Sequence, residues 1–191
     1  MMQLILSSPK FSMKGKKMNL DGKVIIVVGC SGLLGNAIVK SILESGGRVV
    51  AADISISNMV SEYGNEDENI ILEKVDITKK TSIENLISTA EEKFGAVHGA
   101  VNAAYPRNKN YGKSYLDVTF EDFSENMSMH LGGYFLFTQS CLRYSLIKEQ
   151  EFSMVNISSI YGVIAPRFEV YEGTEMTMPV EYAAIKSALI H

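Results

Sequence analysis

A tyrosine and a lysine four residues apart, Tyr182 and Lys186, could together carry acid-base chemistry. In a helix this spacing places the phenol and the ammonium group on one face. A nearby cation lowers the pKa of a phenol, so the tyrosine could exchange a proton with a substrate near neutral pH. The same spacing also occurs by chance in ordinary surface pairs. Ser158 and Ser159, at the end of a predicted strand, would bring hydroxyl groups to the same crevice and favour the catalytic interpretation.

A glycine-rich segment, GCSGLLG at positions 29–35, lies between a predicted strand and a predicted helix. Glycine lets the backbone turn tightly and approach a pyrophosphate, whose charge the helix N-terminus stabilises. The alternative is a tight turn that needs glycine for steric reasons alone. Its position between strand and helix favours a dinucleotide site. The residues predicted to bind the cofactor here are Gly29, Ser31, Gly32, Leu34 and Gly35.

An acidic residue, Asp53, ends the next predicted strand, 18 residues after Gly35. That separation is close to the roughly 20 residues expected of an acid that binds the adenosine ribose. A carboxylate there accepts hydrogen bonds from the ribose hydroxyls and repels a 2′-phosphate, so NAD is favoured over NADP. The alternative is a solvated acid that caps the loop.

These residues stand at the ends of strand-like and helix-like segments that alternate from Lys23 onward. The predicted strands cover 24–28, 48–52, 69–75, 96–102 and 152–157. The predicted helices cover 37–43, 81–94 and 120–147, and a last one starts near 180. This alternation predicts an α/β fold, a Rossmann-type doubly wound parallel sheet with helices on both faces. Two loops, 105–116 and 161–179, follow strands on the side where such sheets bind ligands.

Several short motifs occur in the order found in short-chain dehydrogenases/reductases, and from Leu20 to His191 the sequence resembles that family. They are the glycine loop, Asp53, Asp76-Ile77, VNAA at 101–104, NISS at 156–159, and Tyr182 with Lys186. The resemblance implies that Tyr182 exchanges a proton with the substrate, that Lys186 holds the nicotinamide ribose, and that Ser159 binds the substrate oxygen. It also implies cofactor contacts from Asp76, Ile77, Asn102 and Ala103.

The sequence departs from the family pattern at several places. The family's helix asparagine, which organises a proton-relay water, aligns with His130, and this histidine either serves the relay or only fills the helix packing. Ala103 and Tyr105 replace residues of the usual NNAG stretch. Leu33 replaces a glycine, and the gap of 23 residues from Ser159 to Tyr182 is long. The resulting G-x-x-G-x-x-G spacing is typical of sugar epimerases and dehydratases, which keep their NAD bound.

Two segments, AYPRNK at 104–109 and HLGGYF at 130–135, resemble a bacterial subgroup linked to flagellin modification. The resemblance implies a secondary alcohol or ketone on a sugar derivative as substrate, used for surface glycosylation, with catalysis by Ser159, Tyr182, Lys186 and His130. The alternatives are an NAD-retaining epimerase or dehydratase, or a catalytically silent nucleotide-binding fragment. Arg107 and Lys109 could bind a carboxylate or phosphate, but the sequence favours solvated loop charges.

The net charge, the length of the apolar segments and the cysteine content argue against several other classes of protein. A net charge of -4 disfavours a nucleic-acid partner, and no apolar segment approaches the length of a membrane span. Cys30 and Cys141 form neither a metal-ligand pattern nor a disulfide framework, which predicts core thiols in a cytoplasmic protein without a metal site. Residues 1–18 are predicted to be a disordered extension, and 19–191 an incomplete NAD-binding domain.

The sequence stops inside its last predicted helix, where the family has two further strands. We therefore expect the last strands of the sheet to be missing and this chain alone to be inactive or poorly stable. The family uses its long helices for association, so a full-length form is expected to be a homodimer or homotetramer.

Overall fold

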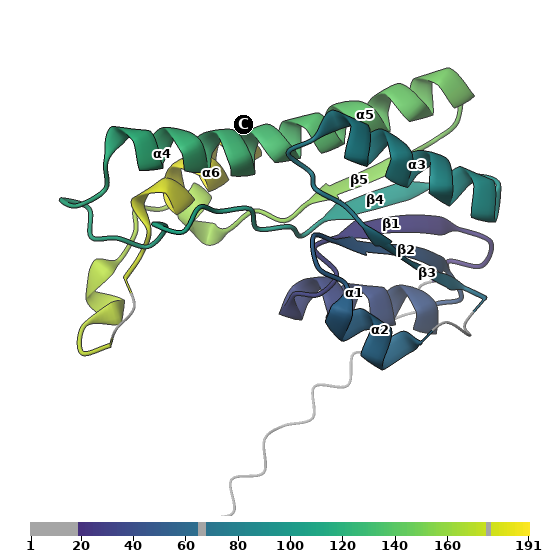
Figure 1. Ribbon diagram of the computed structural model, residues 1–191, viewed down its shortest axis with the longest axis horizontal. Coiled ribbons are helices and arrows are strands. Elements are labelled where there is room, and N and C mark those ends of the chain that lie inside the picture. The colour runs from purple at the N-terminus through teal and green to yellow at the C-terminus, as the bar shows by residue number, and fades with distance from the viewer. Residues whose placement is uncertain (1–18, 65–67, 175–176) are drawn as a thin grey trace, which may run out of the picture.

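The core of the protein is a five-stranded parallel sheet in the order β3-β2-β1-β4-β5 (Figure 1). The computed structural model describes residues 19–64, 68–174 and 177–191, so the extension predicted at 1–18 lies outside the described residues. The strands are β1 (Val24–Val28), β2 (Arg48–Asp53), β3 (Ile70–Lys74), β4 (Gly99–Asn102) and β5 (Ser153–Asn156). This is the Rossmann-type sheet that the alternating sequence pattern predicts.

Helices cover both faces of the sheet. They are α1 (Leu33–Glu44), α2 (Ser57–Tyr63), α3 (Lys80–Phe94), α4 (Phe120–Asn126), α5 (Gly132–Lys148) and α6 (Val180–Ile190). The first two lie on one face, and α3 and α5 lie on the other (Figure 1). The alternating residues of β1 show why both faces are apolar: Ile26 and Val28 pack toward α3 and α5, and Val27 packs toward α1 and α2.

The helical stretch predicted at 120–147 is confirmed, but it contains a feature that the sequence did not predict. A π-helical turn, Met127–Leu131, joins α4 to α5. Single π-helical turns occur frequently at functional sites. The short helix α2 was also not predicted, and β4 begins at Gly99 instead of residue 96.

The strand register brings the carboxyl ends of four strands together. Val28 lies beside Ala52 on one side and Asn102 on the other, and Asn102 lies beside Asn156. The strand order reverses between β1 and β4, and such a point is where open α/β sheets bind ligands. The segments that follow these strands therefore meet at one edge of the sheet.

Candidate active site

The glycine loop after β1 is too tight for side chains at two positions. Gly29 has a φ of +81°, and a Cβ atom there would lie 2.5 Å from the backbone carbon of Ala103. A Cβ atom at Gly35 would lie 2.0 Å from the carbonyl oxygen of Gly29. No described side chain caps the start of α1, so backbone amides there remain available to an anion.

A pocket of about 430 Å³ opens beside this loop. Its lining includes six of the predicted cofactor residues, namely Gly29, Gly32, Asp53, Asp76, Ile77 and Ala103. The other predicted cofactor residues, Tyr182 and Lys186 among them, do not line it. Ser31 donates its hydroxyl to the backbone oxygen of Ser55, Leu34 has a largely exposed side chain, Gly35 lies within the first helix, and Asn102 is fully buried.

Two carboxylates of the pocket are held by short hydrogen bonds. Asp53 Oδ2 accepts from the backbone amide of Ser31 at 3.1 Å, which fixes the carboxylate next to the glycine loop. Asp76 Oδ1 accepts from the amide and the hydroxyl of Thr78 at 3.0 and 2.6 Å. Burial raises the pKa of Asp76, but these hydrogen bonds and the Lys79 ammonium group at 3.3 Å together outweigh it and hold the pKa below its ordinary value. The pocket therefore presents fixed acceptors to a ligand.

Lys186 lies at the centre of the predicted catalytic group and is almost fully buried, with 3% of its surface exposed. Its Nζ donates to the carbonyl oxygen of Ile157 at 2.7 Å and lies 3.4 Å from His130 Nε2. It also stands 5.5 Å from the centre of the Tyr182 ring, so the spacing of four residues does bring the pair together. Burial lowers the pKa of this ammonium group to about 8.

His130 is fully buried on the π-helical turn and faces Lys186. Burial, and then the neighbouring ammonium group, lower the pKa of its imidazole to about 3, so the ring is neutral at physiological pH. A neutral ring that faces an ammonium group must accept at Nε2, which assigns the proton to Nδ1. Among the described residues Nδ1 has no hydrogen-bond partner.

Tyr105 lines the pocket and also contacts His130 and Tyr182. Its ring lines the pocket and lies edge-on to His130 at 5.0 Å and to Tyr182 at 5.7 Å between centroids. Its hydroxyl shares a hydrogen bond of 2.5 Å with Tyr111, and the Arg107 guanidinium stands 5.1 Å from the ring centre. Arg107 also lines the pocket, whereas Lys109 does not.

The two serines after β5 have different partners. Ser158 donates its hydroxyl to the backbone oxygen of Lys186 at 2.9 Å, which ties the strand end to α6. Ser159 Oγ accepts from the amide of Tyr161 at 3.2 Å and caps a 3₁₀ turn, Ile160–Gly162. Its hydroxyl proton has no acceptor among the described residues, so Ser159 can donate to a substrate.

Two buried residues at this site were not predicted. Asn126 precedes the π-helical turn, and Glu181 precedes Tyr182; both are fully buried. They are hydrogen-bonded to each other across 55 positions of sequence. The spacing of four residues from Asn126 to His130 was the one available signal, because it places both on one helical face.

A sequence model described as short chain dehydrogenase matches residues 23–179, which is most of the chain. The chain belongs to the short-chain dehydrogenase family. It therefore belongs to the enzyme class that its motifs predict, a class that acts on CH–OH groups with a nicotinamide cofactor. The match ends before Tyr182 and Lys186, so the roles of these two residues rest on their geometry.

Two relatives and one solved structure illustrate the similarity. A post-translational flagellin modification protein A of Campylobacter coli is 38% identical over 178 residues, which cover 90% of this chain and 69% of the relative. A 2,5-dichloro-2,5-cyclohexadiene-1,4-diol dehydrogenase of Sphingobium indicum is 27% identical and covers 90% of this chain and 64% of the relative. A glucose/ribitol dehydrogenase structure from Brucella melitensis shares the fold, with a TM-score of 0.72 and 21% identity over 92% of this chain and 68% of that chain.

This short-chain dehydrogenase thus spans about two thirds of the length of these relatives. Cys30 and Cys141 are both free and buried, as predicted. Across the described residues, no helix is both long and apolar enough to cross a lipid bilayer.

Proposed function

We propose that the protein is an NAD-dependent oxidoreductase that interconverts a secondary alcohol and a ketone on a sugar derivative used for surface or flagellin glycosylation. The observation that carries the chemistry is the buried ammonium group of Lys186 against the ring of Tyr182. The sugar substrate rests on the resemblance to the Campylobacter coli flagellin modification protein.

The residues of the pocket fit a dinucleotide. Gly29 and Gly35 leave a cradle that a Cβ atom would fill, so a pyrophosphate can approach the backbone next to the first turn of α1. Asp53 would accept from the adenosine ribose hydroxyls, which supports NAD over NADP. Asp76 and Ile77 line the same pocket and would contact the adenine. When bound, the nicotinamide supplies the hydride for reduction or accepts it for oxidation.

The remaining groups handle the proton. In reduction, Tyr182 would donate its phenol proton to the carbonyl oxygen, and in oxidation the tyrosine would recover that proton from the alcohol. Lys186, held by Ile157 and His130, would stabilise the phenolate by its charge and bind the nicotinamide ribose. Ser159 would donate its free hydroxyl proton to the substrate oxygen. Neutral His130 would accept a hydrogen bond from Lys186 and so takes part in the relay.

The glycine spacing also favours a second candidate, a sugar epimerase or dehydratase that keeps its NAD bound. Leu33 stands where the commoner dehydrogenase spacing has glycine, and its side chain is 91% exposed at the start of α1. The two candidates differ in the fate of the hydride. A dehydrogenase releases NADH during turnover, whereas an epimerase or dehydratase returns the hydride to the same substrate.

The first test is calorimetric binding of NADH and NADPH to the chain and to an Asp53→Ala variant. We expect NADH to bind more tightly than NADPH, and the variant to lose that preference. Turnover is then followed as NADH formation with a panel of sugar alcohols, using Tyr182→Phe as a matched control that removes only the phenol oxygen. Tight NADH binding with no turnover would favour the silent nucleotide-binding alternative, and absence of NADH binding by the folded chain would refute the proposed function.

We extend the proposal to the cellular location and the oligomeric state of the enzyme. We propose a cytoplasmic protein that associates as a homodimer or homotetramer through its long helices. Exposed apolar side chains on α5, among them Phe135, Leu142 and Leu146, support such an interface. Light scattering after size-exclusion chromatography would measure the mass, and a monomer at micromolar concentration would contradict this part.

A further inference from the structure

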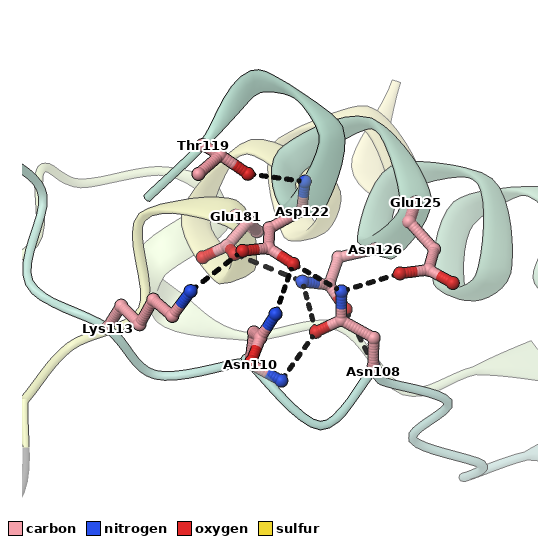
Figure 2. A network of polar contacts seen from close by, with 8 residues as sticks. All are labelled: Asn108, Asn110, Lys113, Thr119, Asp122, Glu125, Asn126 and Glu181. Carbon is pink, nitrogen blue, oxygen red and sulfur yellow. Dashed lines mark hydrogen bonds and ion pairs between the residues drawn. The ribbon is translucent and has the colours of Figure 1, made fainter. Parts of the chain in front are cut away.

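A network of polar side chains includes Glu181, the residue before Tyr182 in the chain (Figure 2). None of its members lines the pocket. The network joins the loop after β4 to α4 and to the start of α6. The members are Asn108, Asn110, Lys113, Thr119, Asp122, Glu125, Asn126 and Glu181. The family assignment does not account for this network, because of its members only Asn108 belongs to a motif described above, and no role was predicted for it.

Asn126 is the centre of the network. Its Oδ1 accepts from the backbone amide of Asn108 at 2.9 Å, and its Nδ2 donates to Asn108 Oδ1 at 3.3 Å. The same Nδ2 donates to Glu181 Oε1 at 3.1 Å. One buried amide therefore holds both the loop after β4 and the first turn of the helix that carries Tyr182 (Figure 2).

The loop side of the network is firmly anchored. Asp122 accepts from the side-chain amides of Asn108 and Asn110 at 3.0 and 2.8 Å and from Lys113 Nζ at 2.9 Å. Thr119 caps the start of α4 by accepting from the amide of Asp122 at 3.1 Å. The loop that brings Tyr105 to the Tyr182 ring is thus fixed to α4 immediately before the π-helical turn.

The burial of the Glu181 carboxyl group opposes folding. The carboxyl group is fully buried, yet Oε2 has no hydrogen-bond partner among the described residues. A buried polar network with an unsatisfied member is less stable than an apolar core of the same shape. Because this arrangement does not serve stability well, its value must lie in what it fixes. Tyr182 is the next residue in the chain and lies on the same first turn of α6.

We propose that Glu181 is a positioning residue for Tyr182, and that Asn126 couples the position of Tyr182 to the loop that carries Tyr105. This inference rests on the proposed role of Tyr182 as proton donor and acceptor. Asn126 and Glu181 hold the first turn of α6, while His130 and Ile157 hold Lys186 one turn later. The helix is therefore fixed on both sides of the tyrosine. Displacement of the loop is transmitted to Tyr182 through Asn108 and Asn126.

A competing explanation is that Glu181 only stabilises the start of α6, where a negative charge interacts favourably with the helix dipole. The two explanations differ in which property of the side chain matters. Positioning needs the reach of the carboxyl group to Asn126 and does not need its charge. Dipole stabilisation needs the charge and does not need that contact.

The experiment compares Glu181→Gln, which keeps the reach and removes the charge, with Glu181→Asp, which keeps the charge and shortens the side chain. The protein is labelled with ¹³Cζ-tyrosine, and the resonance of Tyr182 is assigned with Tyr182→Phe. We expect Glu181→Asp and Asn126→Ala to shift the Tyr182 resonance alike, and Glu181→Gln to leave it in place. Glu121→Asp is the matched control and should leave the resonance in place, because Glu121 is exposed on α4 and is not a member of the network.

Two results would overturn the inference. One is a Tyr182 resonance that moves with Glu181→Gln and stays with Glu181→Asp, as the dipole explanation requires. The other is an unmoved resonance in both Glu181→Asp and Asn126→Ala, with a lower urea midpoint as the one effect. NADH binding is measured on every variant and should match the wild-type protein in Glu181→Gln, because this variant keeps the contact with Asn126. Failure of the wild-type protein to bind NADH would refute the proposed function and leave the resonance test intact.

Discussion

The buried ammonium group of Lys186 should cost the folded protein stability at neutral pH, and this cost can be measured through its pH dependence. Burial lowers the pKa of Lys186 from 10.5 to about 8. Below about pH 8 the folded and unfolded chains both carry the proton, so the full burial penalty is present. Between the two pKa values the folded chain releases the proton while the unfolded chain retains it. The free energy of unfolding therefore rises with pH in this window.

The size of the effect follows from the shift. One pKa unit corresponds to about 1.4 kcal/mol, so the whole shift is worth up to about 3 kcal/mol. Between about pH 7 and about pH 9.5, the titration of this one group should raise the free energy of unfolding by about 2 kcal/mol. Lys186→Met replaces the side chain by an uncharged one of similar length and removes this contribution.

The assay is urea unfolding of the wild-type protein and Lys186→Met, followed by circular dichroism because the chain has no tryptophan. Other titrating groups are common to both proteins, so their contributions largely cancel in the difference. We expect the wild-type protein to gain about 2 kcal/mol relative to the variant between about pH 7 and about pH 9.5. Lys93→Met makes the same change at an exposed position on α3 and should show no such gain. A difference for Lys186→Met that stays constant with pH would refute the reasoning.

Three further predictions concern the glycine loop, the histidine and the turn that carries Ser159. Gly35→Ala places a Cβ atom 2.0 Å from a backbone oxygen and should lower the free energy of unfolding by about 1–3 kcal/mol, measured with urea. The same variant should weaken NADH binding in calorimetry. Gly32→Ala should be tolerated, because its Cβ atom would lie 3.4 Å from the nearest atom. His130→Phe removes an acceptor of Lys186 and should cost about 1 kcal/mol more than His130→Gln, measured by the same unfolding assay. Gly162→Ala places a Cβ atom 2.7 Å from the Lys186 carbonyl oxygen and should lower turnover more than NADH affinity, measured by steady-state kinetics and calorimetry.

The sheet and the glycine loop could be predicted because their signals are local. A run of β-branched residues such as 24–28 has few stable placements other than a strand buried on both faces. Gly29 and Gly35 are required by backbone contacts within the same segment and with Ala103. Helix α2 escaped prediction because its seven residues bury only Met59, so the sequence shows no apolar stripe there.

The polar part of the site could not be predicted in the same way. Asn126 and Glu181 would each be expected on an exposed helical face, because buried amides and carboxylates are rare. Their burial depends on a partner 55 positions away, and no local pattern encodes that pairing. The π-helical turn is equally invisible, because the helix-like pattern continues on both sides of it.

The site concentrates several features that oppose folding in one place. They are a nearly buried ammonium group, a neutral histidine and a buried carboxyl group, all next to Tyr182 or its helix. Within the part of the chain that the structure describes, His130 Nδ1 and Glu181 Oε2 have no hydrogen-bond partner. A π-helical turn, itself uncommon, carries the histidine. A protein that used its Rossmann sheet only to bind a nucleotide would need the pocket and Lys186, but neither the buried histidine nor the buried carboxyl group, since neither lines the pocket. Their collection around one phenol therefore favours proton transfer over silent binding, and the Lys186→Met comparison measures how much stability the chain gives up for it.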